Sequence, residues 1–262
     1  MEPSIDIHVH LGPRWDDVKD VRASVGDLAA ANGQAGVAGS VASSTESLLS
    51  RTPLHAGDDG EMGQRLLAGN EDLLARCREA PWLRMAVVVD PQADGSLQQA
   101  ERMLRETEVV AVKLHPDRHR YRGGEHLDAV LGLLAGFPGK AMLVHCTGTA
   151  YSDPAPMIDR AAAFGSVPVI IAHLGRTSPP DLVIGLIRDR GARNVYVDTS
   201  AMRDAGMVRR AIETIGAERI LFGSDFPFYC PRDIIALIRS SGAAERDLER
   251  ILSLNARELL GA

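Results

Sequence analysis

The sequence is poor in cysteine and contains no long apolar segment. Its 262 residues include only Cys77, Cys146 and Cys230, a sparse and odd count that fits a reducing compartment without a disulfide framework. No apolar run approaches the 18 or so residues that span a bilayer, so no membrane partner is expected. Met1 leads almost directly into a strand-like segment, without the basic and apolar regions of a secretory signal, so we expect a cytoplasmic protein.

The sequence also lacks an excess of basic charge and a glycine-rich nucleotide motif. The formal net charge is −6 and the pI is about 5.8, which argues against a nucleic-acid partner. An open Rossmann-like sheet is the alternative fold, but it normally has G-x-G-x-x-G after its first strand. Residues 8–13 read HVHLGP instead, and no P-loop is present. These absences disfavour both a Rossmann-type dinucleotide site and a P-loop nucleotide site.

What the chain does contain is a repeated alternation of short apolar runs with amphipathic stretches. Eight such units in this length favour a closed (β/α)8 barrel, a TIM-like α/β fold, as a single domain over residues 1–262. The predicted strands are Ile5–His10, Val37–Ser43, Leu83–Val89, Val109–His115, Ala141–Cys146, Val167–His173, Val195–Thr199 and Arg219–Ser224. The clearest helical segments are Leu127–Leu134, Met157–Phe164, Leu182–Arg188 and Val208–Ile215.

Two segments fit this alternation less well. Residues Thr45–Glu61 are rich in Ser, Gly, Asp and Pro, and we expect a long loop there. The segment Ala243–Leu260 is expected to form two short helices that close over the barrel.

Polar residues gather at one end of the predicted strands. Five of the eight histidines lie there, together with a lysine and an aspartate: His8, His10, His115, His145, His173, Lys113 and Asp225. Barrel enzymes carry their catalytic groups at this carboxyl end. Side chains two apart in a strand share a face, so His8 and His10 can converge on one metal ion.

Each of these residues has a separate structural alternative. His8 and His10 could be surface or hydrogen-bonded histidines, and His145 and His173 could be satisfied core histidines. Asp225 follows Gly-Ser and could cap a helix or a turn. A single metal site accounts for all five residues together, which favours the metal interpretation.

The ordered motifs resemble the amidohydrolase superfamily, in particular its small single-domain branch of amidohydrolases and nonoxidative decarboxylases. They extend from residue 5 to residue 260. Each motif alone is common, whereas the ordered set of motifs is highly specific. The matching segments are IDIHVH at 5–10, VKLHP at 112–116, LVHC at 143–146, IIAHLG at 170–175, YVDTS at 196–200, ILFGSDFP at 220–227 and ILSLNARELL at 251–260.

The resemblance implies a role for each matching residue. His8 and His10 correspond to the metal-binding pair after the first strand, and His145 corresponds to the ligand after the fifth. Asp225 corresponds to the carboxylate after the eighth strand, which binds the metal and handles a proton. His173 corresponds to the histidine after the sixth strand, which is catalytic in one-metal members and binds the second ion in two-metal members.

Lys113 decides how many ions are expected. It lies about where two-metal relatives carry a carboxylated lysine. We favour one ion, because the Lys-Leu-His-Pro form is common in the small branch, where the lysine need not bridge. The alternatives are a second ion, or a positive charge that holds a substrate carboxylate or a neighbouring acid. His115 is expected to bind or orient a neighbouring ligand, or to contact substrate.

Three neutral nitrogens and one carboxylate suit zinc, with manganese or iron as alternatives. Such an ion lowers the pKa of bound water from about 15.7 towards about 7. Asp225 would take the water's proton, and His173 would polarise the substrate carbonyl or act as acid–base. The predicted substrate is a small-molecule amide, lactone or ester.

The nearest alternative activity is nonoxidative decarboxylation of a small unsaturated or aromatic acid. Arg14, Arg51 and Arg176 lie in loops on the catalytic side, where they could hold a carboxylate or be solvated. A nuclease should have a basic groove and a glutamate in place of Lys113, whereas a phosphotriesterase-like enzyme should have two metals. A non-catalytic binding protein should have lost polar groups from the strand ends. The oligomeric state stays open, with a homodimer as one option.

Overall fold

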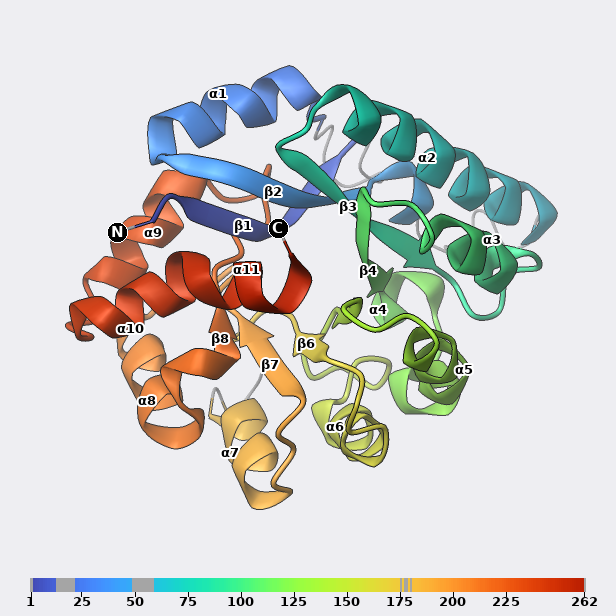
Figure 1. Cartoon of the computed structure of the whole chain (residues 1–262). Helices are drawn as coiled ribbons and strands as arrows, with labels where there is room; N and C mark the ends of the chain where they lie inside the picture. Colours follow the sequence, from blue (N-terminus) through green and yellow to red (C-terminus); the bar gives the residue numbers. More distant parts are fainter. Residues whose placement is uncertain are drawn as a thin grey trace.

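The eight predicted strands form one parallel sheet that curls into a barrel (Figure 1). The computed structural model describes residues 2–12, 22–48, 59–174, 176, 179 and 181–261, without the side chains of Asp59 and Met62. Neighbours in the sheet follow chain order from β1 to β8. The strands are β1 (Ser4–Leu11), β2 (Val37–Ser44), β3 (Leu83–Val89), β4 (Val109–Leu114), β5 (Ala141–Val144), β6 (Val169–Ile171), β7 (Val195–Asp198) and β8 (Ile220–Leu221).

Backbone hydrogen bonds between β1 and the segment after β8 close the barrel. The Ile7 amide donates to Phe222 O at 3.0 Å, the Asp225 amide to His8 O at 2.8 Å and the His10 amide to Phe226 O at 2.7 Å. The fold is therefore the (β/α)8 barrel that the alternation of runs predicts.

Helices surround the sheet, as Figure 1 shows. They are α1 (Val25–Ala35), α2 (Asp59–Glu79), α3 (Ser96–Met103), α4 (Pro116–His119), α5 (Gly123–Ala135), α6 (Pro154–Ala163), α7 (Leu182–Asp189), α8 (Ala205–Ile215), α9 (Pro231–Arg239), α10 (Glu245–Glu249) and α11 (Asn255–Leu260). Short turns are η1 (Glu46–Leu48), η3 (Ala217–Arg219) and the π-helical η4 (Arg250–Leu254). Among the described residues, no helix is both long and apolar enough to cross a membrane.

The barrel interior is apolar at its amino-terminal end. Alternate strand residues such as Ala111, Leu143 and Ile170 form a buried cluster there, and Ala256 and Leu260 of the C-terminal segment join it. α11 therefore closes this end of the barrel, as the sequence predicts for the tail. A second, larger cluster lies between the strands and the surrounding helices.

Some predicted boundaries differ from the structure. The expected loop Thr45–Glu61 is wrong at both ends, because Glu46–Leu48 forms a 3-10 turn and α2 begins at Asp59. Residues 49–58 lie outside the described part of the chain. The last strands are shorter than predicted, and β8 ends at Leu221. Beyond that point the backbone turns so that the following side chains reach the carboxyl end of the barrel.

Candidate metal centre

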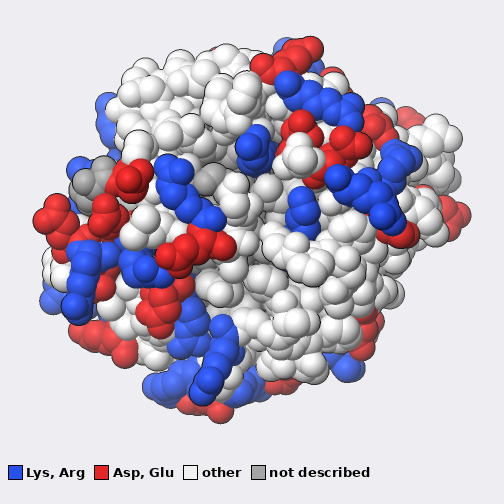
Figure 2. Space-filling view, viewed as in Figure 1, with Lys and Arg blue, Asp and Glu red and all other residues white. Residues whose placement is uncertain are grey.

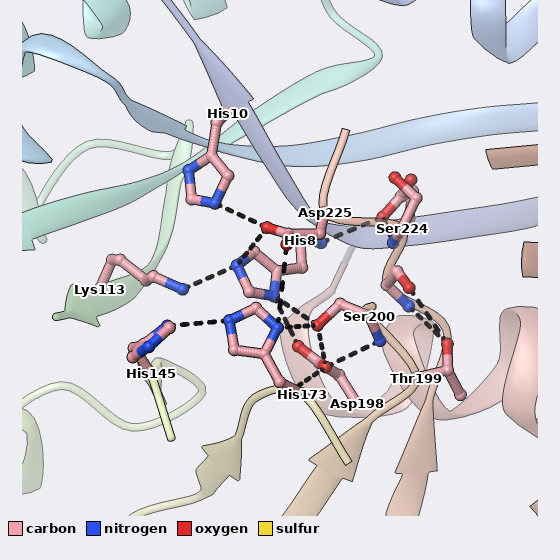
Figure 3. A network of polar contacts seen from close by, with 12 residues as sticks. His8, His10, Lys113, His145, His173, Asp198, Thr199, Ser200, Ser224 and Asp225 are labelled. Atoms are coloured by element: carbon pink, nitrogen blue, oxygen red, sulfur yellow. Dashed lines mark hydrogen bonds and ion pairs between the residues drawn. The ribbon is translucent and has the colours of Figure 1, made fainter. Parts of the chain in front are cut away.

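A buried polar cluster occupies the carboxyl end of the barrel (Figure 3). His10 Nε2 lies 3.1 Å from Asp225 Oδ1, and His8 Nε2 lies 3.7 Å from the same oxygen. One donor atom from each of these three residues falls within 4.8 Å of the others. All three side chains are almost completely buried. The arrangement brings together three of the four residues that the sequence suggests as metal ligands.

A second group of buried side chains holds His8 from the other side. Asp198 Oδ2 accepts a hydrogen bond of 2.7 Å from His8 Nδ1. Asp198 also accepts the His173 amide at 2.9 Å and the hydroxyl of Ser200. Because Nδ1 donates its hydrogen to Asp198, the lone pair of His8 lies on Nε2, the nitrogen that faces the cluster and could bind a cation.

Lys113 points into the same cluster from β4, as Figure 3 shows. Its Nζ lies 2.7 Å from His8 Nε2, and the side chain is fully buried. Burial lowers the pKa of this lysine to about 8, although the carboxylates of Asp198 and Asp225 oppose the shift. The position fits an amine that contacts the metal site directly rather than a distant surface charge.

His145 joins a separate part of the cluster. Its Nδ1 lies 2.9 Å from His173 Nε2, and its Nε2 lies 3.0 Å from Asp117 Oδ2. His115 stacks on the His145 ring with a centroid distance of 3.7 Å. His145 belongs to neither of the two groups of converging donor atoms among the described residues. To bind the same ion as His8, it would have to exchange its contact with His173 or Asp117 for the metal.

Asp117, at the start of α4, anchors the loop that follows β5. Its carboxylate accepts hydrogen bonds from Thr147 and Ser152, each at 2.9 Å, and from Thr149. Burial acts to raise the pKa of Asp117, but hydrogen bonds from His145, Thr149 and Ser152 outweigh it and hold this pKa far below its usual value. Asp117 thus fixes the outer edge of the His145 ring.

The backbone at two of these positions is unusual. His173 has φ +62° and Asp225 has φ +66°, in the left-handed region that branched or bulky side chains rarely occupy. Both residues come just after a short strand, so the turn re-aims their side chains into the barrel mouth. Such conformations persist where the surrounding structure holds them, and they cluster at functional sites.

A register irregularity in β1 places the two histidines. Ile5 and Ile7 belong to the cluster inside the barrel, whereas Val9 belongs to the cluster outside it. The pairing of β1 with β2 shifts between Asp6 and Val9. This shift changes which residues face inward, so that His8 and His10 follow Ile7 on the inner side.

Burial decides the protonation of the cluster. It lowers the pKa of His8, His10 and His173 well below the ordinary imidazole value, because the surroundings disfavour the charged ring. Burial also raises the pKa of Asp225 to about 7, against the lowering effect of Lys113. The rings are therefore neutral at pH 7, which is the form that binds metals.

The donor set fits a divalent cation. Two neutral imidazoles and one carboxylate converge, and the far nitrogen of His8 is held by Asp198. A carboxylate that orients a metal-binding histidine in this way is a common feature of metal sites. The match of residue types, protonation and orientation supports a metal site on structural grounds alone.

The remaining predicted residues divide into described and undescribed positions. Arg176 is exposed, its amide donates to His173 O at 3.0 Å, and its charge opposes the rise that burial causes in the pKa of Asp225. It therefore lies at the same mouth of the barrel as the polar cluster. Arg14 and Arg51 fall outside the described residues.

Sequence reasoning missed four polar residues of the cluster. Asp198 lies just after three apolar residues of β7, in the same layer as the predicted histidines, and that position is a usable signal. Ser200 follows it, and Asp6 precedes His8 in β1. Asp117 carries no comparable signal, because its role depends on a contact with another loop.

The fold and the site together define an enzyme of the (β/α)8 class with its polar groups at the carboxyl ends of the strands. The sequence matches the amidohydrolase family over residues 5–262, so the chain belongs to that family. No match was found among curated proteins.

Several solved structures share the fold. A 2,6-dihydroxybenzoate decarboxylase from Rhizobium has a TM-score of 0.76 at 16% identity, over 100% of this chain and 99% of that one. A dihydroxybenzoic acid decarboxylase from Polaromonas sp. JS666, solved with manganese and 2-nitroresorcinol, has a TM-score of 0.76 at 14% identity, over 100% and 97%. A proposed 2-pyrone-4,6-dicarboxylic acid hydrolase from Pseudomonas putida has a TM-score of 0.70 at 18% identity, over 100% and 98%.

Proposed function

We propose that this protein is a metal-dependent hydrolase that cleaves a small-molecule amide, lactone or ester. The observation that carries the proposal is the convergence of His8 Nε2, His10 Nε2 and Asp225 Oδ1, with His8 Nδ1 bonded to Asp198. Barrel closure places the backbone of β1 beside the segment after β8, and the three side chains then turn their donor atoms to one point. A shared cation accounts for this convergence, and the burial that keeps the two rings neutral leaves them in the form that binds a metal.

One divalent ion per chain is proposed, held by His8, His10 and Asp225, with His145 as the expected fourth ligand. Zinc suits these donors best, and manganese is the alternative because it is bound in one of the similar decarboxylases. Lys113 then acts as an amine beside His8 rather than as a carboxylated bridge. Its lowered pKa leaves a larger neutral fraction than an ordinary lysine has.

The residues around the ion have distinct tasks. A bound divalent ion supplies a water molecule that loses its proton near neutral pH. When the ion is bound, the carboxylate of Asp225 would accept that proton and pass it to the leaving group. His173 is held by Ser200 and His145 through its two ring nitrogens, and it would exchange its Nε2 contact with His145 for a hydrogen bond to the substrate carbonyl. Burial of the cluster keeps other water molecules away from these groups.

Nonoxidative decarboxylation of an aromatic or unsaturated acid is the second candidate. It is favoured by the similarity over the whole chain to two such decarboxylases. It is also favoured by the positive charges near the site, since Lys113 and Arg118 both lower the pKa of His10. These two positive groups could hold the carboxylate of a substrate.

The metal proposal is tested with His8→Ala. Elemental analysis of the purified wild-type protein should find about one divalent ion per chain, and the variant should lose it together with at least about 1,000-fold in kcat/KM. His126→Ala is the matched control, because His126 lies on the outer helix α5. Full activity of a metal-free His8→Ala protein would refute the proposal.

The two reactions are separated by their products. Lactones, amides and esters should yield a new carboxylic acid, which chromatography of the products detects. Hydroxybenzoates and unsaturated dicarboxylates should yield carbon dioxide only if the second candidate is correct. Metal-dependent release of carbon dioxide, with no hydrolysis of any carbonyl substrate, would replace the first proposal by the second.

A further inference from the structure

A cavity of about 660 Å³ lies at the opposite end of the barrel from the metal centre. It is bounded by the end of α7, the segment leading into β7, the turn η3 and the C-terminal elements η4 and α11. Four arginines line it: Arg188, Arg193, Arg219 and Arg250. Figure 2 shows basic side chains gathered over α7 on this face of the molecule.

Positive charge exceeds negative charge around this cavity. Its only described acidic lining residues are Glu218 and Glu258. Arg250 pairs with Glu258 at 2.7 Å, and Arg188 pairs with Asp189 at 2.7 Å. Within the described part of the chain, neither Arg193 nor Arg219 forms an ion pair with a carboxylate.

Arg219 is held in place by backbone carbonyls instead. Its Nε donates to Ile215 O at 2.6 Å, and its Nη1 donates to Ala192 O at 3.4 Å. These contacts orient the guanidinium without neutralising it. An arginine whose rotamer is already fixed loses little entropy when it binds an anion.

The cavity also has an apolar side. Tyr196 on β7 is half-buried at its wall, and Leu259 of α11 lies beside it. The volume falls within the range of small-molecule sites, roughly 300–1,000 Å³. An aromatic ring and an aliphatic side chain beside arginines suit a ligand that has an organic body and a strongly charged end.

We propose that this cavity binds a small organic phosphate. A phosphate monoester carries about −1.5 to −2 charges at pH 7, which matches two arginines that lack carboxylate partners. Guanidinium groups bind phosphate oxygens bidentately, which gives direction as well as charge. The organic part then packs on Tyr196 and Leu259. The site is separate from the metal centre, so it stands or fails independently of the proposed reaction.

Binding is tested by calorimetry with phenyl phosphate, which has a phosphate for the arginines and a ring for Tyr196. Phenol is the uncharged control and inorganic phosphate the control without a ring. Phenyl phosphate should bind, inorganic phosphate should bind more weakly, and phenol should not bind measurably. Failure of phenyl phosphate to bind at millimolar concentration would overturn the proposal.

Variants locate the site. Arg193→Gln and Arg219→Gln should each weaken binding of phenyl phosphate at least tenfold, because each removes an uncompensated positive charge. Arg193 is exposed, so its replacement keeps the fold even if that of Arg219 does not. Arg188→Gln is the matched control and should have a smaller effect, because Arg188 already pairs with Asp189.

A final variant separates this cavity from the metal centre, which also attracts phosphate. Asp225→Asn alters the metal centre and should leave binding of phenyl phosphate unchanged. Loss of binding in Asp225→Asn, with unaltered binding in Arg193→Gln, would assign the ligand to the metal centre and overturn the proposal.

Discussion

At the scale of single residues, carboxylates set the orientation of the imidazole rings and the nitrogen that carries the hydrogen. Asp198 accepts a hydrogen bond from His8 Nδ1, and Asp117 lies at hydrogen-bond distance from the outer nitrogen of His145. A histidine ring can rotate and can carry its proton on either nitrogen, so an unsupported ring would bind a cation poorly. The carboxylates remove that freedom before any ligand arrives.

Asp198→Asn should therefore weaken metal binding about 10- to 100-fold, because the amide offers His8 a donor or a weaker acceptor. The measurement is a competition titration with a metal-binding dye. Asp189→Asn is a suitable control, since Asp189 is exposed at the end of α7. An unchanged dissociation constant in Asp198→Asn would show that His8 is not held through this contact.

Asp6 links the site to the pH dependence of stability. Its carboxylate is fully buried and accepts the amides of Ser224 at 2.9 Å and His8 at 3.2 Å. Burial raises the pKa of Asp6 to about 7. The folded protein thus keeps this proton at pH values where the unfolded chain, with a carboxyl pKa of about 3.9, has lost it. The contribution of Asp6 to stability consequently falls as pH rises from about 4 to about 7.

Asp6→Asn should remove that dependence while keeping an oxygen that accepts the two amides. The free energy of unfolding of the variant, relative to wild type, should increase between pH 5 and pH 7 by about 1 kcal/mol or more. Urea unfolding of both proteins in a chelating buffer measures the difference at each pH. A difference that stays constant with pH would mean that Asp6 titrates normally in the folded protein.

At the scale of secondary-structure elements, the site depends on how closely β8 approaches β1. Gly223 follows β8, and a Cβ atom at this position would lie 2.9 Å from the Cβ of His8 and 3.4 Å from the carboxylate of Asp198. Only glycine allows this approach without displacing His8. Both the closure of the barrel and the position of the His8 side chain therefore depend on the absence of a side chain at Gly223.

Gly223→Ala should destabilise the protein by about 1–3 kcal/mol and weaken metal binding at least tenfold, because the new methyl group must push His8 or Asp198 aside. Thermal unfolding and metal titration measure the two effects. Gly132→Ala on α5 is the matched control, since a Cβ there meets nothing within 4 Å. Wild-type metal affinity in Gly223→Ala would contradict the close approach.

At the scale of the whole molecule, the two ends of the barrel have different tasks. The carboxyl end holds the polar cluster, and the amino-terminal end is closed by the C-terminal segment. Asn255 anchors this segment, because its buried amide donates to Ala217 O and Ile220 O, each at 2.7 Å. The Asn255 contacts and the polar cluster thus lie at opposite ends of the barrel.

Asn255→Ala should lower the free energy of unfolding by about 2–3 kcal/mol, since two buried carbonyl groups lose their donor. The affinity for the metal should stay within about twofold of wild type, because the ligands lie at the far end of the strands. Chemical denaturation and metal titration of the same sample test both statements. A large loss of metal affinity without loss of stability would contradict the structural role given to Asn255.

The sequence determined the alternation of strands and helices and the layer in which the polar residues lie. Periodicity and strand position are local properties, so His8, His10, His173 and Asp225 were predictable from their places after apolar runs. The family motifs extend this prediction across residues 5–262. Strand ends were less predictable, as β8 shows, because hydrogen bonds with a distant strand decide where a strand stops.

Only the tertiary structure decided which side chains touch. The shift in β1 that turns His8 inward, the contact of Asp198 with His8, and the pairing of Asp117 with His145 all join segments distant in the chain. The cavity on the opposite face also arises only when α7 and the C-terminal segment are packed together. A sequence records the chemistry of each side chain, whereas closure of the barrel sets the distances between them.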